Sequence, residues 1–148
     1  MKHDLNQQNK ITSEPSNSQI KWWEKELGRN APSNCAWLCK DDVIVCFFNY
    51  TGDDVELAIA GKKGWATRQF VTYVFIYTYL QLKCVRCTVR VAASNTISLK
   101  MVNKLGFKCE GIIRQALNGE DCLIFGMLET ESRWHIKRGK TSGKKVKT

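Results

Sequence analysis

Histidine and proline are both scarce in this chain, which has two of each among 148 residues. The two histidines, His3 and His135, fall in segments that we predict to be terminal tails. A Ser-His-Asp or Cys-His nucleophile therefore lacks its usual base, and a zinc site lacks histidine ligands. We expect no metal, and we expect that any enzyme built on this chain works without a catalytic histidine.

Long apolar runs are also missing. The longest candidate, residues 70–82, is interrupted by polar side chains and falls short of the ~20 residues of a membrane-spanning helix. The first nineteen residues are polar and show no signal-peptide pattern. The sequence therefore predicts a single soluble domain located in the cytoplasm, with no membrane partner.

The seven cysteines are odd in number, and most have apolar neighbours, such as Cys46 in VIVCFF and Cys122 in DCLIFG. Such a pattern is typical of core packing in a reducing compartment. Cys84 and Cys87 have the CxxC spacing, but they fall on a predicted strand. Because alternate strand residues face opposite sides, we expect these two side chains to point apart, which excludes a redox motif.

Acidic residues are absent from the middle of the chain. Residues 57–109 carry nine Lys or Arg and no Asp or Glu, and residues 135–148 add six more basic residues, in a chain of net charge +9. An acid-free segment suits a polyanion, either a phosphate-bearing cofactor or nucleic acid. The alternative is a basic face that is simply solvated. Likewise, the tail is either a flexible solubilising end or a contact to nucleic acid or the ribosome.

Hydrophobic periodicity and turn residues predict an α/β domain. We expect a folded domain at residues 16–134, with a flexible N-terminus at 1–15 and a basic flexible tail at 135–148. The predicted helices are 18–27, 67–82 and 95–105, the last with Ile97, Met101, Val102 and Leu105 facing inward. The predicted strands are 34–39, 43–50, 54–60, 84–92, 111–116 and 122–129, the last two joined by the hairpin turn Asn118-Gly119.

The strand at 54–60 has two unlike faces. Leu57 and Ile59 lie on a bulky face, whereas Glu56 and Ala58 lie on a small face that leaves room for a ligand. A glycine-punctuated basic loop follows this strand and leads into a helix. A helix N-terminus presents free amides and the positive end of the helix dipole, so the arrangement suits a phosphate. The alternative is an ordinary strand-to-helix turn.

The order of motifs resembles the GNAT acyltransferase superfamily, and within it the ribosomal-protein N-terminal acetyltransferases. The residues that carry the resemblance are DVELAIAGKKGWATRQF from Asp54, Asn95-x-x-Ser98, LGF at 105–107, Glu110-Gly111 and Arg114. They span roughly residues 54–130. The resemblance implies a GNAT fold: a mixed, mostly antiparallel sheet with a splayed parallel strand pair at the cofactor cleft and helices on both faces.

The resemblance also implies acetyl-CoA as cosubstrate. Its pantetheine arm would pair with the strand at Leu57, Ala58 and Ile59, with Asn95 beside it. Its pyrophosphate would bind the loop residues Gly61, Lys62, Lys63, Gly64, Trp65, Ala66 and Thr67. The family has Gln or Arg at the first loop position, where this chain has Gly61.

For the chemistry, the resemblance assigns to Ser98 the protonation of the departing thiolate. Many members use a tyrosine for that step, at the place where this chain has Val102. Glu56, on the small strand face, is the candidate base that takes the amine proton, and Asp54 is the second choice. The alternative for Glu56 is an ordinary solvated carboxylate. Glu110 is expected to be structural.

The predicted function is therefore transfer of an acetyl group to an amine, which is a protein N-terminus, a lysine or a small amine. An α-amine, with a pKa of ~7.7–8.0, is deprotonated more easily than lysine by roughly 3.5 kcal/mol, which favours an α-amine here. The acidic residues Asp41, Asp42, Asp53, Asp54, Glu120 and Asp121 would favour a cationic acceptor if they surround the substrate mouth. The alternatives are a non-catalytic GNAT-fold module that binds CoA or a partner, and a nucleic-acid-associated protein.

Overall fold

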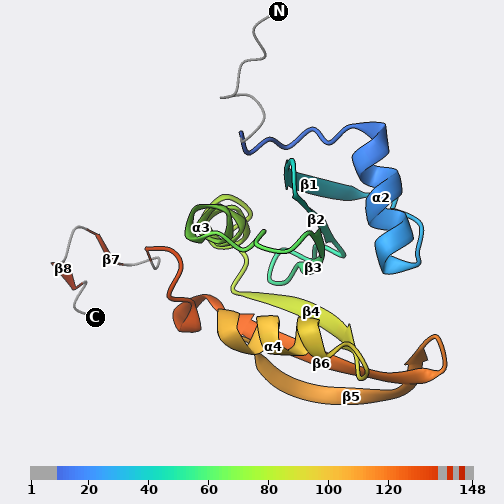
Figure 1. The fold of residues 1–148 in the computed structure, drawn as a ribbon. Helices are drawn as coiled ribbons and strands as arrows, with labels where there is room; N and C mark the ends of the chain where they lie inside the picture. Colours follow the sequence, from blue (N-terminus) through green and yellow to red (C-terminus); the bar gives the residue numbers. More distant parts are fainter. Residues whose placement is uncertain (1–9, 137–139, 142–143, 146–148) are drawn as a thin grey trace, which may run out of the picture.

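The computed structural model describes residues 10–136, 140–141 and 144–145. Its main feature is a six-stranded sheet with the strand order β1-β2-β3-β4-β6-β5 (Figure 1). The strands are β1 (Cys35–Lys40), β2 (Val43–Phe48), β3 (Glu56–Gly61), β4 (Arg86–Ala92), β5 (Lys108–Leu117) and β6 (Glu120–Leu128). The helices are α2 (Asn17–Leu27), α3 (Arg68–Ile76), the π-helical turn η1 (Tyr77–Gln81), α4 (Thr96–Leu105) and the 3-10 turn η2 (Glu129–Glu131). Two short strands, β7 (Lys140–Thr141) and β8 (Lys144–Lys145), form a separate pair.

The sheet consists of two antiparallel halves that diverge from one another. Strands β1 to β3 form one half, and β4, β6 and β5 form the other. The halves meet where β3 runs parallel to β4, and the register there contains a single pair, Glu56 with Thr88. Beyond it the two strands separate (Figure 1). The predicted mixed sheet with a splayed parallel pair is therefore confirmed.

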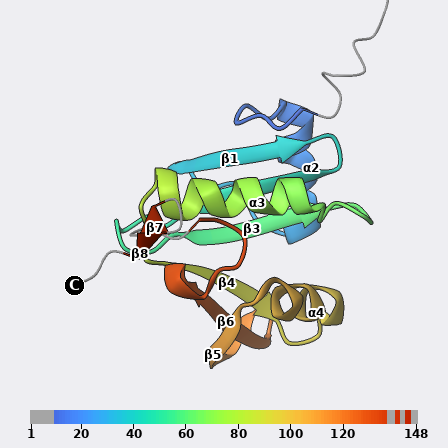
Figure 2. The same ribbon diagram turned by 90° about the vertical axis from the view of Figure 1, so that its left-hand side faces the viewer.

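Helices cover both faces of the sheet, as predicted, with α3 and α4 on one face and α2 on the other (Figure 2). Strand alternation explains this division, because Val55, Leu57 and Ile59 contribute to the core beneath α3 and α4. Ala58 and Ala60 instead pack with Trp23 of α2. The small face of β3 that we expected to be open is therefore largely covered by a helix of the chain itself.

The helix boundaries follow from capping residues. Ser16 begins α2 with a capping box, and Gly28 ends it in the left-handed conformation. Thr67 and Asn95 accept a backbone hydrogen bond at the starts of α3 and α4. The predicted helix at 67–82 is confirmed, but its last turn widens into the π-helical turn η1. There the buried Tyr79 hydroxyl donates to the carbonyl oxygen of Met127 over 2.6 Å.

Two predicted side-chain directions are wrong. Cys84 and Cys87 lie in the same core cluster, because β4 begins only at Arg86, after a left-handed residue at Lys83 (φ +59°). Strand alternation therefore does not extend back to Cys84. Ile97 is 80% exposed, because the first turn of α4 extends past the core that its later turns cover.

Two segments near the ends of the described chain are held in the fold. Thr12 forms a β-bridge with Cys39. The His135 side chain is fully enclosed, stacks on Tyr79 with ring centroids 4.8 Å apart, and bonds Glu129 through Nε2 over 3.0 Å. Most of the predicted basic tail lies outside the described residues, so its contact with nucleic acid or the ribosome stays a prediction. Among the described residues no helix has the length and apolar character to cross a membrane.

Candidate active site

A cavity of about 480 Å³ opens where β3 and β4 separate. Side chains from both faces of the sheet line it. Val89, Val91 and Ser98 contribute from the side of α3 and α4, and Glu56 and Arg90 from the side of α2. The cavity therefore reaches both faces of the sheet, so that two reactants have room to approach one another from opposite sides.

On the α4 side, the cavity wall contains the residues assigned by the motif Asn95-x-x-Ser98. Asn95 Oδ1 accepts a hydrogen bond from the Ser98 amide over 3.1 Å, and this bond caps the helix. The Asn95 NH₂ group takes no part in the cap. The Ser98 hydroxyl makes no hydrogen bond within the described part of the chain. Val102 also lines the cavity, at the place where many GNAT members have a tyrosine, and supplies only apolar surface.

In the loop after β3, some backbone amides are hydrogen-bonded within the protein and others are not. The amides of Lys62, Trp65 and Thr67 donate to backbone oxygens over 2.8, 3.0 and 2.8 Å. By contrast, the amides of Lys63, Gly64 and Ala66 have no acceptor among the described residues. Since they lie close to the N-terminus of α3, these three amides fit an anion better than the other three.

Gly61 has a steric reason for lacking the side chain that the family carries there. A Cβ atom at Gly61 would lie 2.3 Å from Cδ1 of the Trp65 indole, far inside van der Waals contact. Trp65 packs edge-on against Phe70 in the core, with ring centroids 6.2 Å apart. The indole therefore takes the space that a Gln or Arg side chain at residue 61 would need.

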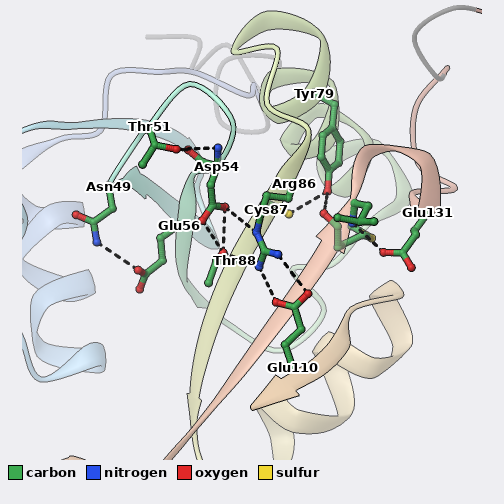
Figure 3. Close-up of polar contacts among 12 residues, drawn as sticks. Asn49, Thr51, Asp54, Glu56, Tyr79, Arg86, Cys87, Thr88, Glu110 and Glu131 are labelled. Carbon is green, nitrogen blue, oxygen red and sulfur yellow. Dashed lines mark hydrogen bonds and ion pairs between the residues drawn. The ribbon is translucent and has the colours of Figure 1, made fainter. Parts of the chain in front are cut away.

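Glu56, the candidate base, is buried at the α2 side of the cavity, with its side chain 11% exposed. Asn49 Nδ2 donates to Oε1 over 3.3 Å (Figure 3). On the other side of the carboxylate, Arg90 Nε lies 3.4 Å from Oε2. Asn49 adopts a left-handed conformation (φ +53°) just after β2. The guanidinium and the amide both orient the carboxylate at the cavity.

Asp54, the second-choice base, has a different environment. Thr88 Oγ1 donates to both of its carboxylate oxygens over 3.0 and 2.9 Å, and Arg86 Nε lies 3.4 Å away (Figure 3). Arg86 also bonds Glu110 through Nη2 over 2.7 Å, and this hydrogen bond is the main reason that the pKa of Arg86 is raised. Among the described residues Glu56 lines the cavity, and Asp54 does not. Glu110 is ion-paired with Arg86 of the neighbouring half-sheet strand β4, and its structural role stays a prediction.

Four charged side chains line the cavity: Glu26, Arg29, Glu56 and Arg90. The condition for favouring a cationic acceptor is not met, since the described lining contains none of Asp41, Asp42, Asp53, Asp54, Glu120 and Asp121. Some of these carboxylates instead accept hydrogen bonds from nearby backbone: Glu120 from the Ser94 amide over 2.9 Å and Asp121 from the Gln115 amide over 3.0 Å.

Sequence reasoning missed Arg29 and Arg90 as site residues. Strand alternation places Arg90 on the same face as Glu56 once the strand pairing is known, so a usable signal existed for it. Arg29 follows the helix-ending Gly28, and nothing in its sequence neighbourhood points to a site. Among the described residues, no group of three or more His, Cys, Asp or Glu side chains is placed to hold a metal ion.

No family model and no curated protein matches this sequence. Solved structures do match it in fold. A chimera of the Vibrio cholerae spermidine N-acetyltransferase SpeG with hSSAT is 15% identical, with a TM-score of 0.66 over 82% of this chain and 97% of that chain. The N-acetyltransferase PseH of Campylobacter jejuni is 16% identical, with a TM-score of 0.59 over 82% and 98%. A GNAT-family acetyltransferase from Bacillus anthracis is 18% identical, with a TM-score of 0.56 over 75% and 73%.

These structural neighbours are acetyltransferases of the GNAT family, and they give no support to the ribosomal-protein branch in particular. At identities of 15–18% the likeness concerns the fold. It agrees with the element order, the splayed strand pair and the helices on both faces. The chain therefore has the fold of the GNAT acetyltransferases.

Proposed function

We propose that this protein is an acetyl-CoA-dependent N-acetyltransferase that transfers the acetyl group directly to an amine. One observation carries the proposal: a cavity passes between β3 and β4 and has a carboxylate on one face of the sheet and a serine hydroxyl on the other. Direct transfer needs both reactants side by side, a base for the amine and an acid for the thiolate. The cavity provides a place for each.

The chain has groups suited to each part of acetyl-CoA. The Gly64 and Ala66 amides, with Lys62 and Lys63 beside them, would hold the pyrophosphate at the start of α3. The backbone of β3 at Leu57 to Ile59, which separates from β4, would pair with the pantetheine amides. The Asn95 side chain would contact the same arm from α4.

In the proposed reaction, a neutral amine attacks the thioester carbonyl carbon from the α2 side. Glu56 takes the proton that the nitrogen loses, directly or through a water molecule. The tetrahedral intermediate collapses, the C–S bond breaks, and Ser98 donates a proton to the departing thiolate. Arg90 and Asn49 hold the Glu56 carboxylate in place between turnovers. Because Val102 offers no hydroxyl, Ser98 or a water molecule is the candidate acid.

The acceptor favoured by this site is an α-amine, since its lower pKa reduces the cost of deprotonation. The cysteines all lie within the described residues and form no disulfide, which suits a reducing compartment such as the cytoplasm.

Two measurements test the proposal. Acetyl-CoA at millimolar concentration should raise the melting temperature and bind by calorimetry, whereas ADP alone should bind more weakly. Free CoA thiol should then appear when a panel of amines is added. Absence of both binding and thiol release would overturn the proposal.

A second candidate, a CoA-binding module without catalysis, is favoured by two observations. Val102 replaces the usual tyrosine, and Glu56 is already paired with Arg90. Such a module would bind acetyl-CoA but release no thiol with any amine. The same two measurements therefore distinguish an enzyme from a module.

A further inference from the structure

The α2 side of the cavity, where the acceptor amine would enter, has a guanidinium without an acidic partner. The Arg29 side chain stacks over the Phe48 ring, with its Cζ 4.7 Å from the ring centroid, and lies 5.9 Å from the Trp23 ring. Among the described residues Arg29 forms no ion pair or side-chain hydrogen bond. Stacking on an aromatic ring holds a guanidinium in place while its N–H donors stay available.

Arg29 lies close to the candidate base. Phe48 of β2 pairs directly with Glu56 of β3 in the sheet register, so their side chains are neighbours on the α2 face. Arg29 and Glu56 also line the same cavity. The mouth therefore presents a proton acceptor and, beside it, a group suited to bind a carboxylate in two-point fashion.

The charges around the mouth argue against a polycationic acceptor. The two lining carboxylates, Glu26 and Glu56, are matched by the two lining guanidiniums, and Arg90 already neutralises Glu56. A polyamine would bring several positive charges next to Arg29 and Arg90 with no surplus of negative charge to receive them. An amine that also carries a carboxylate would place its nitrogen at Glu56 and its anionic group at Arg29.

We infer that the acceptor is an amine bearing a carboxylate, and that Arg29 determines this specificity by binding the carboxylate. The inference rests on the proposed acetyl transfer. Two sources share this chemistry: a free amino acid, and a peptide N-terminus with an acidic side chain in its first residue. The experiment separates these two sources.

The experiment measures thiol release from acetyl-CoA with the full-length protein and matched pairs of acceptors. Glycine is compared with glycinamide, the peptide Asp-Ala-amide with Asn-Ala-amide, and spermidine is the polycation. The wild type should prefer the carboxylate-bearing member of at least one pair by about 10- to 100-fold in kcat/KM, the usual range for a charged hydrogen bond. The pair that shows the preference identifies the source.

The two acceptors of a pair differ in the intrinsic reactivity of their amines. Comparing the preference of a variant with that of the wild type cancels this difference. In Arg29→Gln the preference within the pair should fall to near unity, and Arg29→Lys should restore part of it. Lys25→Met is the matched control, because Lys25 is a basic residue of the last turn of α2 that does not line the cavity. It should keep the wild-type preference. The melting temperature of each variant checks that the fold is intact.

The outcomes separate this inference from the function beneath it. Thiol release with equal preference in wild type and Arg29→Gln, or with spermidine as the best acceptor, overturns the carboxylate inference and leaves acetyl transfer standing. Failure of every amine, together with no binding of acetyl-CoA, overturns both. A loss of rate in Arg29→Gln that is the same for both members of a pair assigns to Arg29 a structural role only.

Discussion

Two carboxylate–guanidinium groups connect the two half-sheets, one just before β3 begins and one at its first residue. They differ in how completely their polar atoms are used. At the closed end of the strand pair, Asp54 and Glu110 share Arg86, and Thr88 donates to Asp54 (Figure 3). At the open end, Glu56 has one contact from Arg90 and one from Asn49, both longer than 3.2 Å. The first group is saturated, whereas the second retains acceptor capacity.

This difference teaches how to separate structural from functional carboxylates when both are ion-paired. The closed-end group fastens two strands, and Gly126 makes room for it, since a Cβ there would lie 2.5 Å from the Glu110 carboxylate. The open-end group lines a cavity and has few contacts, so a substrate nitrogen can add one more. The number of hydrogen-bond partners and the position relative to the cavity, more than charge, distinguish a structural carboxylate from a functional one.

The largest expected effect is on catalysis at the open end. Glu56→Gln should lower kcat/KM for acetyl transfer by about 10²–10⁴-fold, the usual contribution of a general base, with little change in melting temperature. Asp54→Asn, at the closed end, should lower it less than tenfold. Steady-state thiol release measures both. An equal loss of activity in the two variants would contradict the assignment of the catalytic role to Glu56 and not to Asp54.

The next effect is on stability at the closed end. Arg86→Met should lower the free energy of unfolding by about 1–3 kcal/mol, because it leaves Asp54 and Glu110 without their charged donor. Arg90→Met should cost less than about 1 kcal/mol, because its side chain is 45% exposed and serves one carboxylate. Urea titration at pH 7 gives both values. A costlier Arg90→Met would show that the open end is structural too.

A smaller effect distinguishes the role of the Asn49 side-chain amide from the role of its left-handed backbone. Asn49→Gly should keep the left-handed conformation and lose only the bond to Glu56, so stability should change little and kcat should fall several-fold. Asn49→Ala should lose roughly a further 1–2 kcal/mol of stability, since alanine is strained in that conformation. Identical behaviour of the two variants would mean that the backbone at residue 49 carries no strain.

The smallest effect comes from the thiols near the two groups. Burial raises the pKa of Cys87, near Asp54 and Arg86, to about 12, from 9.0 in the unfolded chain. A raised thiol pKa stabilises the fold below pH 9, and this contribution is lost between pH 9 and 12 as the unfolded chain ionises first. The urea midpoint should fall over that range, and it should fall less steeply in Cys87→Ala.

Cys122, near Glu56 and Arg90, gives the matched measurement. Burial raises its pKa as well, but the nearby Arg90 opposes the shift. Cys122→Ala should therefore flatten the alkaline decline less than Cys87→Ala does. The same slope in the wild type and in Cys87→Ala would contradict the role assigned to burial.

The sequence predicted those features that depend on neighbours along the chain. Alternation predicted the strands, and hydrophobic periodicity predicted the helices, because both patterns arise from residues a few positions apart. Glu56, Ser98 and Asn95 were also predicted, and the structure places them around one cavity. Their roles stay predictions until measured.

The sequence did not predict features that depend on pairing between distant segments. The acid-free middle of the chain appeared to be surplus positive charge, yet Arg86, Arg90 and Lys108 are paired with carboxylates from other segments. His135 appeared to belong to a tail, but its ring is enclosed because η1 and η2 meet there. Arg29 gained its importance only from folding over Phe48.

The single register pair between β3 and β4 has a mechanical consequence. Backbone hydrogen bonds join the two half-sheets near the closed end of the strand pair, where Val85 and Arg86 donate to Asp53 and Thr88 donates to Val55. Beyond that end, the angle between the half-sheets depends on the side chains packed across the gap, such as Leu57, Phe75 and Phe107. The packing of the core thus determines how widely the cleft between β3 and β4 opens. A substitution such as Phe107→Leu would narrow or relax the opening without touching any reactant, so the volume of the core helps to determine which substrates fit.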